Sequence, residues 1–295
     1  MNYTIKIPNF TQRGFSKSLL SLVIFAGLGC SPKLIILQQK PEWAKGGYNY
    51  YVGRIEHKLS KSKNDPVLFQ QGCQALTQYT FGFIMEEADR IIMTDYLGGK
   101  KIFMEANLHF GRAVNYGNKS LSLKFDQYDN WISNQSDQIP NFTEADISYL
   151  FWTAAAYGGA IKSSRGNPEW VVLLPRVGQL LEVGLNIDPD WNKGALYSAM
   201  ISYTMSRHDP PKQVERVAED YFNKAVAASN GLDIGTYVNM AESVSIPTQN
   251  KNQFTNLLYK ALNIDIKENT DLVLTNQINR NRAQWLLDNI DEYFY

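Results

Sequence analysis

The sequence predicts an all-α fold, and three observations support the prediction. Apolar residues recur at the three- and four-residue spacing of a helix face through most of the chain after residue 48. No segment shows the strict alternation of apolar and polar residues that marks a strand. A fixed spacing of small and large residues also recurs from one helical segment to the next, as in proteins built from stacked helical hairpins.

The clearest segment spans residues 149–190 and consists of two predicted helices joined by a polar turn. The first helix carries a run of small residues, which let another helix backbone approach closely: Ala154, Ala155, Ala156, Gly158, Gly159 and Ala160. Pro168 ends the turn and suits the first position of the second helix. That helix ends before Pro189, because proline cannot continue it. One such hairpin cannot bury its own apolar face, so it requires neighbours of the same kind.

The rest of the chain supplies these neighbours. Gly98 and Gly99 are predicted to interrupt the helical pattern, and the polar residues 118–142 leave room for only one short helix. The other helices are predicted, in order, over residues 48–59, 68–92, 101–115, 123–132, 193–205, 214–229, 234–244, 253–262 and 272–289.

A helical repeat is indicated by one spacing: a small or apolar residue, a large one four positions later and a small one three positions after that. The spacing matches the second helix of a tetratricopeptide repeat, where the small residues admit the partner helix. It occurs at Ala106, Phe110 and Ala113; at Val177, Leu181 and Gly184; at Ala218, Phe222 and Ala225; and at Phe254, Leu258 and Ala261. We therefore expect degenerate tetratricopeptide-like hairpins packed into a compact α-solenoid or bundle, with a generic helical bundle as the alternative.

The amino terminus has the pattern of a secretory signal peptide. Basic residues precede a short apolar run over residues 19–28, which is shorter than the ~20 apolar residues that a spanning helix needs. Cys30 follows Gly29 directly, as the acylated cysteine does in a bacterial lipoprotein, although Gly27 stands where leucine is usual. There are two alternatives: an ordinary signal peptide with an incidental cysteine, and an uncleaved membrane anchor.

These patterns predict three regions. A lipoprotein signal peptide covers residues 1–29, a lipid-anchored tether covers 30–47, and a helical tetratricopeptide-like domain covers 48–295. Lipidation at Cys30 would hold the protein on a membrane, since two or more acyl chains give stable attachment. The protein is then expected in the bacterial cell envelope, facing the periplasm, on either the inner or the outer membrane.

Several runs of residues resemble a known family, the T component associated with TRAP transporters, whose members are bacterial lipoproteins. The resemblance extends in order from about residue 46 to the carboxyl end and departs in 118–142. The matching runs are Thr77 to Arg90 (TQYTFGFIMEEADR), Leu150 to Ile161 (LFWTAAAYGGAI), Val183 to Leu196 (VGLNIDPDWNKGAL), Ala241 to Pro247 (AESVSIP), Phe254 to Ile264 (FTNLLYKALNI) and Leu274 to Leu287 (LTNQINRNRAQWLL).

The resemblance implies an accessory component of a tripartite ATP-independent periplasmic transporter. It implies a fold of degenerate tetratricopeptide-like motifs with an apolar pore or cavity, a homotrimer, and association with a periplasmic solute-binding protein. The cargo it implies is a hydrophobic or amphipathic small molecule. The six aromatic residues in the matched runs that we take as candidates to line such a cavity are Tyr79, Phe83, Phe151, Trp152, Tyr157 and Trp285, with packing in the core as the alternative for each.

The composition argues against other classes of function. Lysine plus arginine and aspartate plus glutamate number 29 each, so the net charge of zero gives no electrostatic drive toward nucleic acid. We find no nucleotide-binding, hydrolase or metalloprotease motif, and His57, His109 and His208 share no ligand spacing. We therefore expect no catalytic residue, no metal ligand and no cofactor.

Three further expectations concern a cysteine, a group of acidic residues and an arginine. Cys73 lies among apolar residues and is expected to be buried structure. Glu86, Glu87 and Asp89 are expected to form a solvated helix face. Arg282, on an otherwise apolar helix, is expected to hold a neighbouring carboxylate or helix end rather than a ligand.

The favoured interpretation is a membrane-anchored lipoprotein that binds an apolar ligand and docks a solute-binding protein. A tetratricopeptide scaffold that binds protein segments in envelope assembly is the first alternative, and an open groove with polar walls would favour it. An envelope enzyme is the second, and a cleft with clustered carboxylates or histidines would favour that one.

Overall fold

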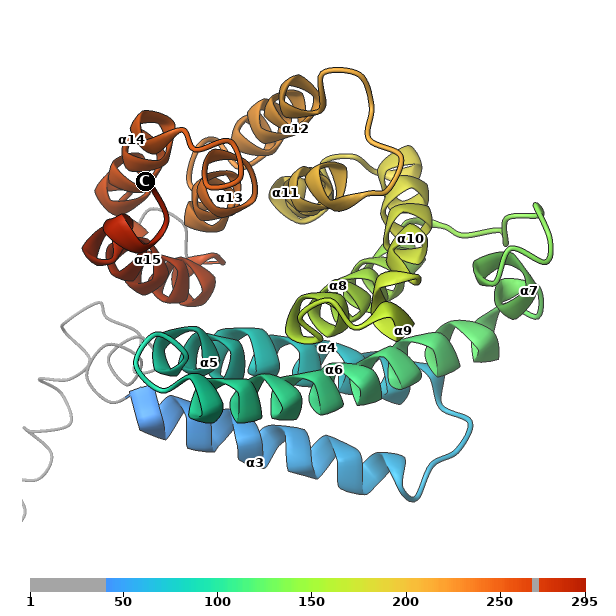
Figure 1. The fold of residues 1–295 in the computed structure, drawn as a ribbon. Coiled ribbons are helices and arrows are strands. Elements are labelled where there is room, and N and C mark those ends of the chain that lie inside the picture. Colours follow the sequence, from blue (N-terminus) through green and yellow to red (C-terminus); the bar gives the residue numbers. More distant parts are fainter. Residues whose placement is uncertain (1–40, 267–270) are drawn as a thin grey trace, which may run out of the picture.

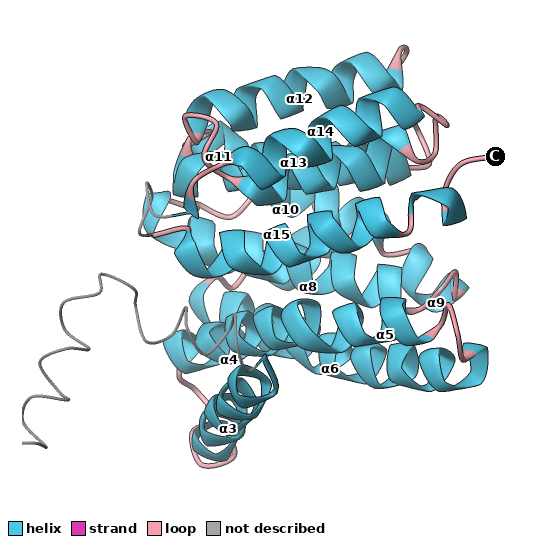
Figure 2. Cartoon of the chain, turned by 90° about the vertical axis from the view of Figure 1, so that its left-hand side faces the viewer, coloured by secondary structure: helices cyan, strands magenta, loops and turns pink. Residues whose placement is uncertain are grey.

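The computed structural model describes residues 41–266 and 271–295, and every regular element in these ranges is helical. The all-α prediction is confirmed. Figures 1 and 2 show the helices stacked in pairs that follow one another around a central space. The predicted signal peptide and Cys30 lie outside the described residues.

The body of the fold consists of consecutive helix pairs, each packed on the next. In chain order the pairs are α4 (Pro66–Tyr79) with α6 (Tyr96–Lys124), α8 (Ile147–Ser163) with α10 (Leu174–Ile187), α11 (Trp191–Ser206) with α12 (Val214–Ala228), and α13 (Ile234–Met240) with α14 (Lys251–Asn263). The shorter elements are η1 (Thr80–Met85), α5 (Glu86–Ile91), α7 (Tyr128–Ile132), η2 (Glu144–Asp146), α9 (Pro168–Val171), η3 (Ala241–Ser245) and η5 (Ile290–Glu292).

A single helix covers each end of the row. The helix α3 (Pro41–Leu59) packs on α4, and α15 (Val273–Asp288) packs on α13 and α14. The row curves so strongly that α15 comes to lie beside α5, which belongs to the first pair (Figures 1 and 2). The first and last parts of the described chain therefore meet, and the solenoid closes into a ring.

The predicted small-large-small residues lie on the second helix of each pair. On α6, Ala106, Phe110 and Ala113 are completely buried, and the equivalent residues on α10 and α14 are buried as well. On α12 the two alanines are buried and Phe222 is half-buried. The spacing thus identified the face that each second helix turns toward its neighbours.

The run of small residues on α8 admits α6. Phe110 of α6 lies against Gly159 so closely that a Cβ on this glycine would be 2.3 Å from its Cε1 atom. Gly117 of α6 meets Thr153 of α8 in the same way, with a Cβ position 2.4 Å from Oγ1. The close approach predicted for this helix is confirmed, and its partner is α6.

The buried side chains form two clusters that meet at α11. Leu196, Met200 and Tyr203 belong to the cluster that contains the first two pairs, and Ile201 belongs to the cluster of the last two pairs and α15. One helix therefore contributes to both parts of the core, which joins the two halves of the ring.

Several element boundaries differ from the predictions. α6 runs through Gly98 and Gly99, because Asp95 caps it and accepts a hydrogen bond from the Gly98 N–H at 2.9 Å. In this first turn a Cβ on Gly98 would lie 2.3 Å from Asp95 Oδ2 and one on Gly99 would lie 2.4 Å from Ile92 Cβ, so there is no room for a side chain at either position. α3 begins at Pro41 and includes residues 41–47, which we had assigned to the tether. Only residues 128–132 of the predicted short helix over 123–132 form a separate helix.

The stretch Pro168–Ile187 is, among the described residues, long and apolar enough to cross a membrane by length and composition alone, with a mean hydropathy of 1.2. In the fold it is divided into α9 and α10 at Val172 and Leu173. The α10 part packs on α8, and Leu180 and Leu181 lie in the core. It therefore serves as the second arm of a hairpin in this fold.

Candidate functional site

A cavity of about 620 Å³, called the central cavity below, lies on the inner side of the ring. It reaches the size range of pockets that hold small organic ligands, about 300–1,000 Å³. Residues of η1 and of helices from three pairs form its wall, and most of this wall is apolar. The apolar residues are Phe81, Phe151, Ala154, Ala155, Gly158, Ile161, Leu174, Val177, Leu181, Ala199 and Ile246. The run of small residues on α8 thus faces α6 on one side and this cavity on the other.

Two π-helical segments contribute to the wall. η1 continues α4 and supplies Phe81, and η3 continues α13 and supplies Glu242 and Ser243. A π segment adds one residue to a helical turn and so rotates the following side chains, and such segments are frequent at functional sites. Both occur within runs that match the T component family.

Three polar side chains of the wall form a small network. Asn239 Oδ1 accepts hydrogen bonds from the hydroxyl groups of Ser202, at 2.5 Å, and Ser243, at 2.9 Å. Asn239 Nδ2 donates to the Ser198 carbonyl oxygen at 2.6 Å. The network joins α11 to α13 and η3 across the wall.

Charge in the wall comes from Lys162 and Glu242. Glu242 Oε1 accepts a hydrogen bond from Arg282 Nη2 at 2.6 Å. Burial raises the pKa of Glu242, but the positive charges of Lys162 and Arg282 outweigh burial and hold its pKa below the ordinary value of 4.5. Glu242 is therefore ionised at neutral pH and bound to a partner within the protein.

Arg282 connects the two ends of the ring. The residue is only 7% exposed. Besides Glu242 it pairs with Asp89, at 2.9 Å, and with Glu86, at 3.5 Å, both on α5 of the first pair. The expectation that Arg282 holds neighbouring carboxylates is confirmed.

The solvated face that we expected for Glu86, Glu87 and Asp89 is wrong for two of the three residues. Glu86 and Asp89 are turned toward Arg282 and are mostly covered, while Glu87 pairs with Lys45 of α3. Burial raises the pKa of Glu86, and the negative charges of Glu242 and Asp89 also raise it. Arg282 lowers the pKa without offsetting these effects, since it is 3.5 Å from Glu86 and only 2.6 Å from Glu242. The partner lies almost two hundred residues away, so sequence spacing gave no sign of it.

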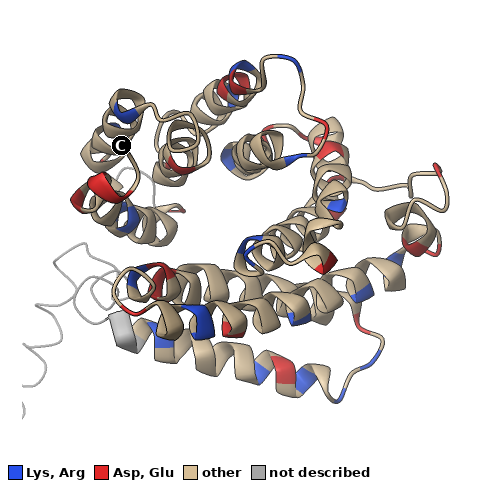
Figure 3. Ribbon diagram, in the orientation of Figure 1, with Lys and Arg blue, Asp and Glu red and all other residues tan. Residues whose placement is uncertain are grey.

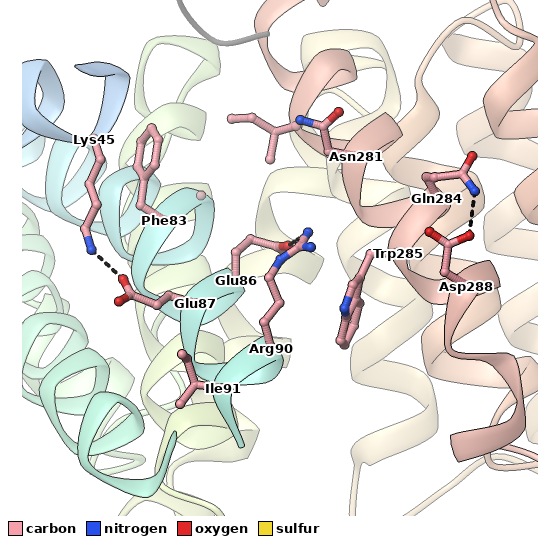
Figure 4. Close-up of a pocket in the computed structure, with 12 residues that line it drawn as sticks. Lys45, Phe83, Glu86, Glu87, Arg90, Ile91, Asn281, Gln284, Trp285 and Asp288 are labelled. Carbon is pink, nitrogen blue, oxygen red and sulfur yellow. Dashed lines mark hydrogen bonds and ion pairs between the residues drawn. The ribbon is translucent and has the colours of Figure 1, made fainter. Parts of the chain in front are cut away.

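A second pocket, of about 650 Å³, opens at the seam where α15 meets the first pair. Figure 4 shows Phe83, Arg90 and Ile91 on one side and Asn281, Trp285 and Asp288 on the other. The centroid of the Trp285 ring is 4.6 Å from the guanidinium carbon of Arg282 and 5.2 Å from that of Arg90. The seam therefore combines ion pairs with cation–π contacts.

The six candidate aromatic residues fall into different places. Phe151 lines the central cavity, and Phe83 and Trp285 line the seam pocket. Tyr79 and Tyr157 are buried in the core, and Trp152 packs against the core and against Phe151 with ring centroids 5.1 Å apart. The Tyr157 hydroxyl accepts hydrogen bonds from Asn118 Nδ2, at 2.8 Å, and Arg176 Nη1, at 3.0 Å. The structure thus brings only some of the candidates to a cavity.

Most of the cavity wall was not identified from the sequence. The small residues of α8 predict close helix packing, but they do not by themselves predict a cavity. Gly158 has open space where a Cβ would be and lines the cavity. Lys162, Ser202 and Asn239 gave no signal, because single polar residues on amphipathic helices are usually solvated. Their common location depends on the curvature of the ring.

Cys73 is buried, with 1% of its surface exposed, and its Sγ donates to the Trp152 carbonyl oxygen at 3.4 Å. Burial raises the pKa of its thiol to about 12. We expect no reaction of Cys73 with a thiol reagent such as dithionitrobenzoate in the native protein at pH 8, since the thiolate is the reactive form. A chain with Cys30 changed to serine contains this one cysteine, so release of a stoichiometric chromophore before unfolding would contradict the prediction.

Charges of both signs are interspersed around the ring (Figure 3). Among the described residues no group of histidine, cysteine, aspartate and glutamate side chains is arranged to hold a metal ion. His109 is half-buried beside Tyr79, with ring centroids 5.9 Å apart, and burial together with Arg112 lowers its pKa.

The central cavity on the inner side of the ring is apolar with a few polar groups, and this is the geometry of a binding site.

Comparison with known proteins agrees with the resemblance noted in the sequence. A family model described as "TRAP transporter T-component" matches residues 38–294. An uncharacterised protein of Treponema pallidum (strain Nichols) is 19% identical over 224 residues, which cover 73% of this chain and 68% of that protein. The chain belongs to the TRAP transporter T-component family, and its role is that of an accessory component of a TRAP transporter at the cell envelope.

Proposed function

We propose that this protein is a lipoprotein, anchored through Cys30 and facing the periplasm, that binds a hydrophobic or amphipathic molecule and docks the periplasmic solute-binding protein of its transporter. The central cavity carries the proposal. Its wall is mainly apolar, its volume of about 620 Å³ suits a small organic molecule, and it is lined by residues of η1, α8, α10, α11, α13 and η3. Family membership supports the transporter as the setting.

Ligand binding is tested with the unacylated mature chain, which here means residues 30–295 with Cys30→Ser. This chain contains every described helix. Isothermal titration with dodecanol below its solubility limit is expected to give saturable binding at one site per chain. Titration with glycerol, which has no apolar chain, is the control and is expected to give no heat of binding. Absence of binding by dodecanol and by longer alcohols would contradict a ligand-binding role.

Docking is tested by sedimentation velocity of the same chain with and without the solute-binding protein of the transporter from the same organism. We expect the chain alone to sediment as a homotrimer, as the family resemblance implies, and to form a faster species with the solute-binding protein. An unrelated periplasmic binding protein is the control. Docking of a protein partner without any apolar ligand would favour the scaffold function instead.

Anchoring is tested in cells that express the complete chain. Metabolic labelling with a tagged fatty acid is expected to label the wild-type protein and to leave Cys30→Ser unlabelled. A wild-type protein that is processed but carries no label would indicate an ordinary signal peptide.

A further inference from the structure

The two charged side chains in the wall of the central cavity differ in one respect. Glu242 is bound to Arg282 at 2.6 Å. Lys162, in contrast, has no carboxylate within ion-pair distance among the described residues, although Glu242 is near enough to feel its charge. Among the described residues the cavity wall therefore offers one positive group without an ion pair at contact distance, and one negative group that has such a pair.

Lys162 lies at the end of a strip of small residues on α8 that line the cavity. Ala154, Gly158 and Lys162 are spaced four residues apart on α8, so they lie along one face of the helix. Eight residues of α-helix extend roughly 12 Å. A strip of small residues of about this length thus leads along the cavity to the lysine, and Phe151 and Leu181 belong to the wall beside it.

The network of Ser202, Asn239 and Ser243 carries no charge, so it is a weaker anchor for an anion than Lys162. The hydroxyl groups of Ser202 and Ser243 both donate to Asn239 Oδ1, so their oxygen atoms offer lone pairs to a ligand. A cationic head group is also disfavoured, since it would have to compete with Arg282 for Glu242 beside the positive charge of Lys162.

We propose that the central cavity takes an amphipathic anion, with its apolar chain along the strip of small residues on α8 and its anionic head group on Lys162. This inference rests on the proposed ligand-binding function and specifies the class of ligand. A carboxylate and a phosphate monoester would both satisfy it, so the test includes both.

The test compares ligands that share one apolar chain and differ in the head group. The unacylated mature chain is titrated at pH 7 with dodecanoate, dodecyl phosphate, dodecanol and dodecylammonium, each below its micellar concentration. We expect dodecanoate or dodecyl phosphate to bind at least tenfold more tightly than dodecanol, and dodecylammonium to bind most weakly. The tighter of the two anions identifies a fatty-acid-like or a phospholipid-like head group.

Variants then locate the head group. Lys162→Met keeps the length of the side chain and removes its charge, and we expect it to weaken anion binding about tenfold while dodecanol binding stays the same. Lys162→Arg is expected to retain the preference for anions. Lys100→Met, which removes an equivalent charge from an exposed position on α6, is the matched control and is expected to change nothing.

The outcomes separate this inference from the function on which it rests. Equal binding of dodecanol and dodecanoate, or an anion preference that survives Lys162→Met, would overturn the assignment of Lys162 and leave the apolar site in place. Failure of all four amphiphiles to bind would overturn the ligand-binding function itself.

Discussion

Arg282→Gln is expected to lower the free energy of unfolding by about 3–5 kcal/mol, because it leaves covered carboxylates without their partner. Arg282 is 7% exposed and pairs with Asp89, Glu86 and Glu242. It also brings α15 to the first helix pair, so the ring loses its main polar contact at the seam. Denaturant unfolding followed by circular dichroism measures the change.

The control for this variant is Lys251→Gln. Lys251 pairs with Asp291 at 3.1 Å, but both side chains are largely exposed, and such pairs contribute little. A loss of stability in Arg282→Gln that is no larger than in the control would contradict the role of Arg282 in closing the ring.

The stability difference should also depend on pH in a defined direction. In the wild-type protein the pKa of Glu242 is below 4.5, so its contribution is present at neutral pH and is lost as the pH falls through the folded-state value. In Arg282→Gln, loss of the guanidinium raises the pKa of Glu242 and of Glu86, so the destabilising effect of these two carboxylates at neutral pH is relieved as they are protonated. We therefore expect the difference between wild type and variant to be largest near pH 7 and to narrow toward pH 4. A difference that grows as the pH falls would be inconsistent with this cluster.

Gly158→Phe is expected to abolish binding of apolar ligands while the fold is retained. A Cβ on Gly158 would meet no atom within 4 Å, and the residue lines the central cavity, so an aromatic ring at this position would occupy the ligand's space. Replacing a glycine inside a helix also removes a backbone entropy cost of roughly 0.5–1 kcal/mol. Titration with dodecanol and thermal unfolding together measure the two effects.

The neighbouring glycine provides the contrast. A Cβ on Gly159 would lie 2.3 Å from Phe110 Cε1, so Gly159→Ala overpacks the contact between α8 and α6 and should cost about 1–3 kcal/mol of stability. Gly158→Ala, in contrast, should be neutral or stabilising and should retain binding. Unchanged ligand affinity in Gly158→Phe would show that the ligand does not occupy this cavity.

The sequence predicted the helices well where burial follows a local period. Phe110 and Leu258 stand at the large position of the recurring spacing, and both are completely buried. The small residues of α8 predicted a close helix contact, which α6 supplies. These predictions succeed because each depends on side chains within two or three turns of one helix.

The site was predicted less well because it depends on residues distant in sequence. The spacing of Glu86, Glu87 and Asp89 predicts a row of solvated acids, because the partner of Glu86, Arg282, belongs to α15 and is distant in sequence. Large aromatic residues in the matched runs are candidates to line a cavity, but Tyr157 is a core residue whose hydroxyl accepts hydrogen bonds from Asn118 and Arg176. The π segments that turn Phe81 and Glu242 inward have no recognisable sequence signal.

The most direct test of a ligand in the central cavity is native mass spectrometry of the unacylated mature chain, purified without detergent, followed by organic extraction. We expect each chain to carry one co-purified amphipathic molecule that extraction removes, and Gly158→Phe to be purified without it. A wild-type protein that is empty after purification and also fails to bind any of the four dodecyl compounds on titration would contradict the account.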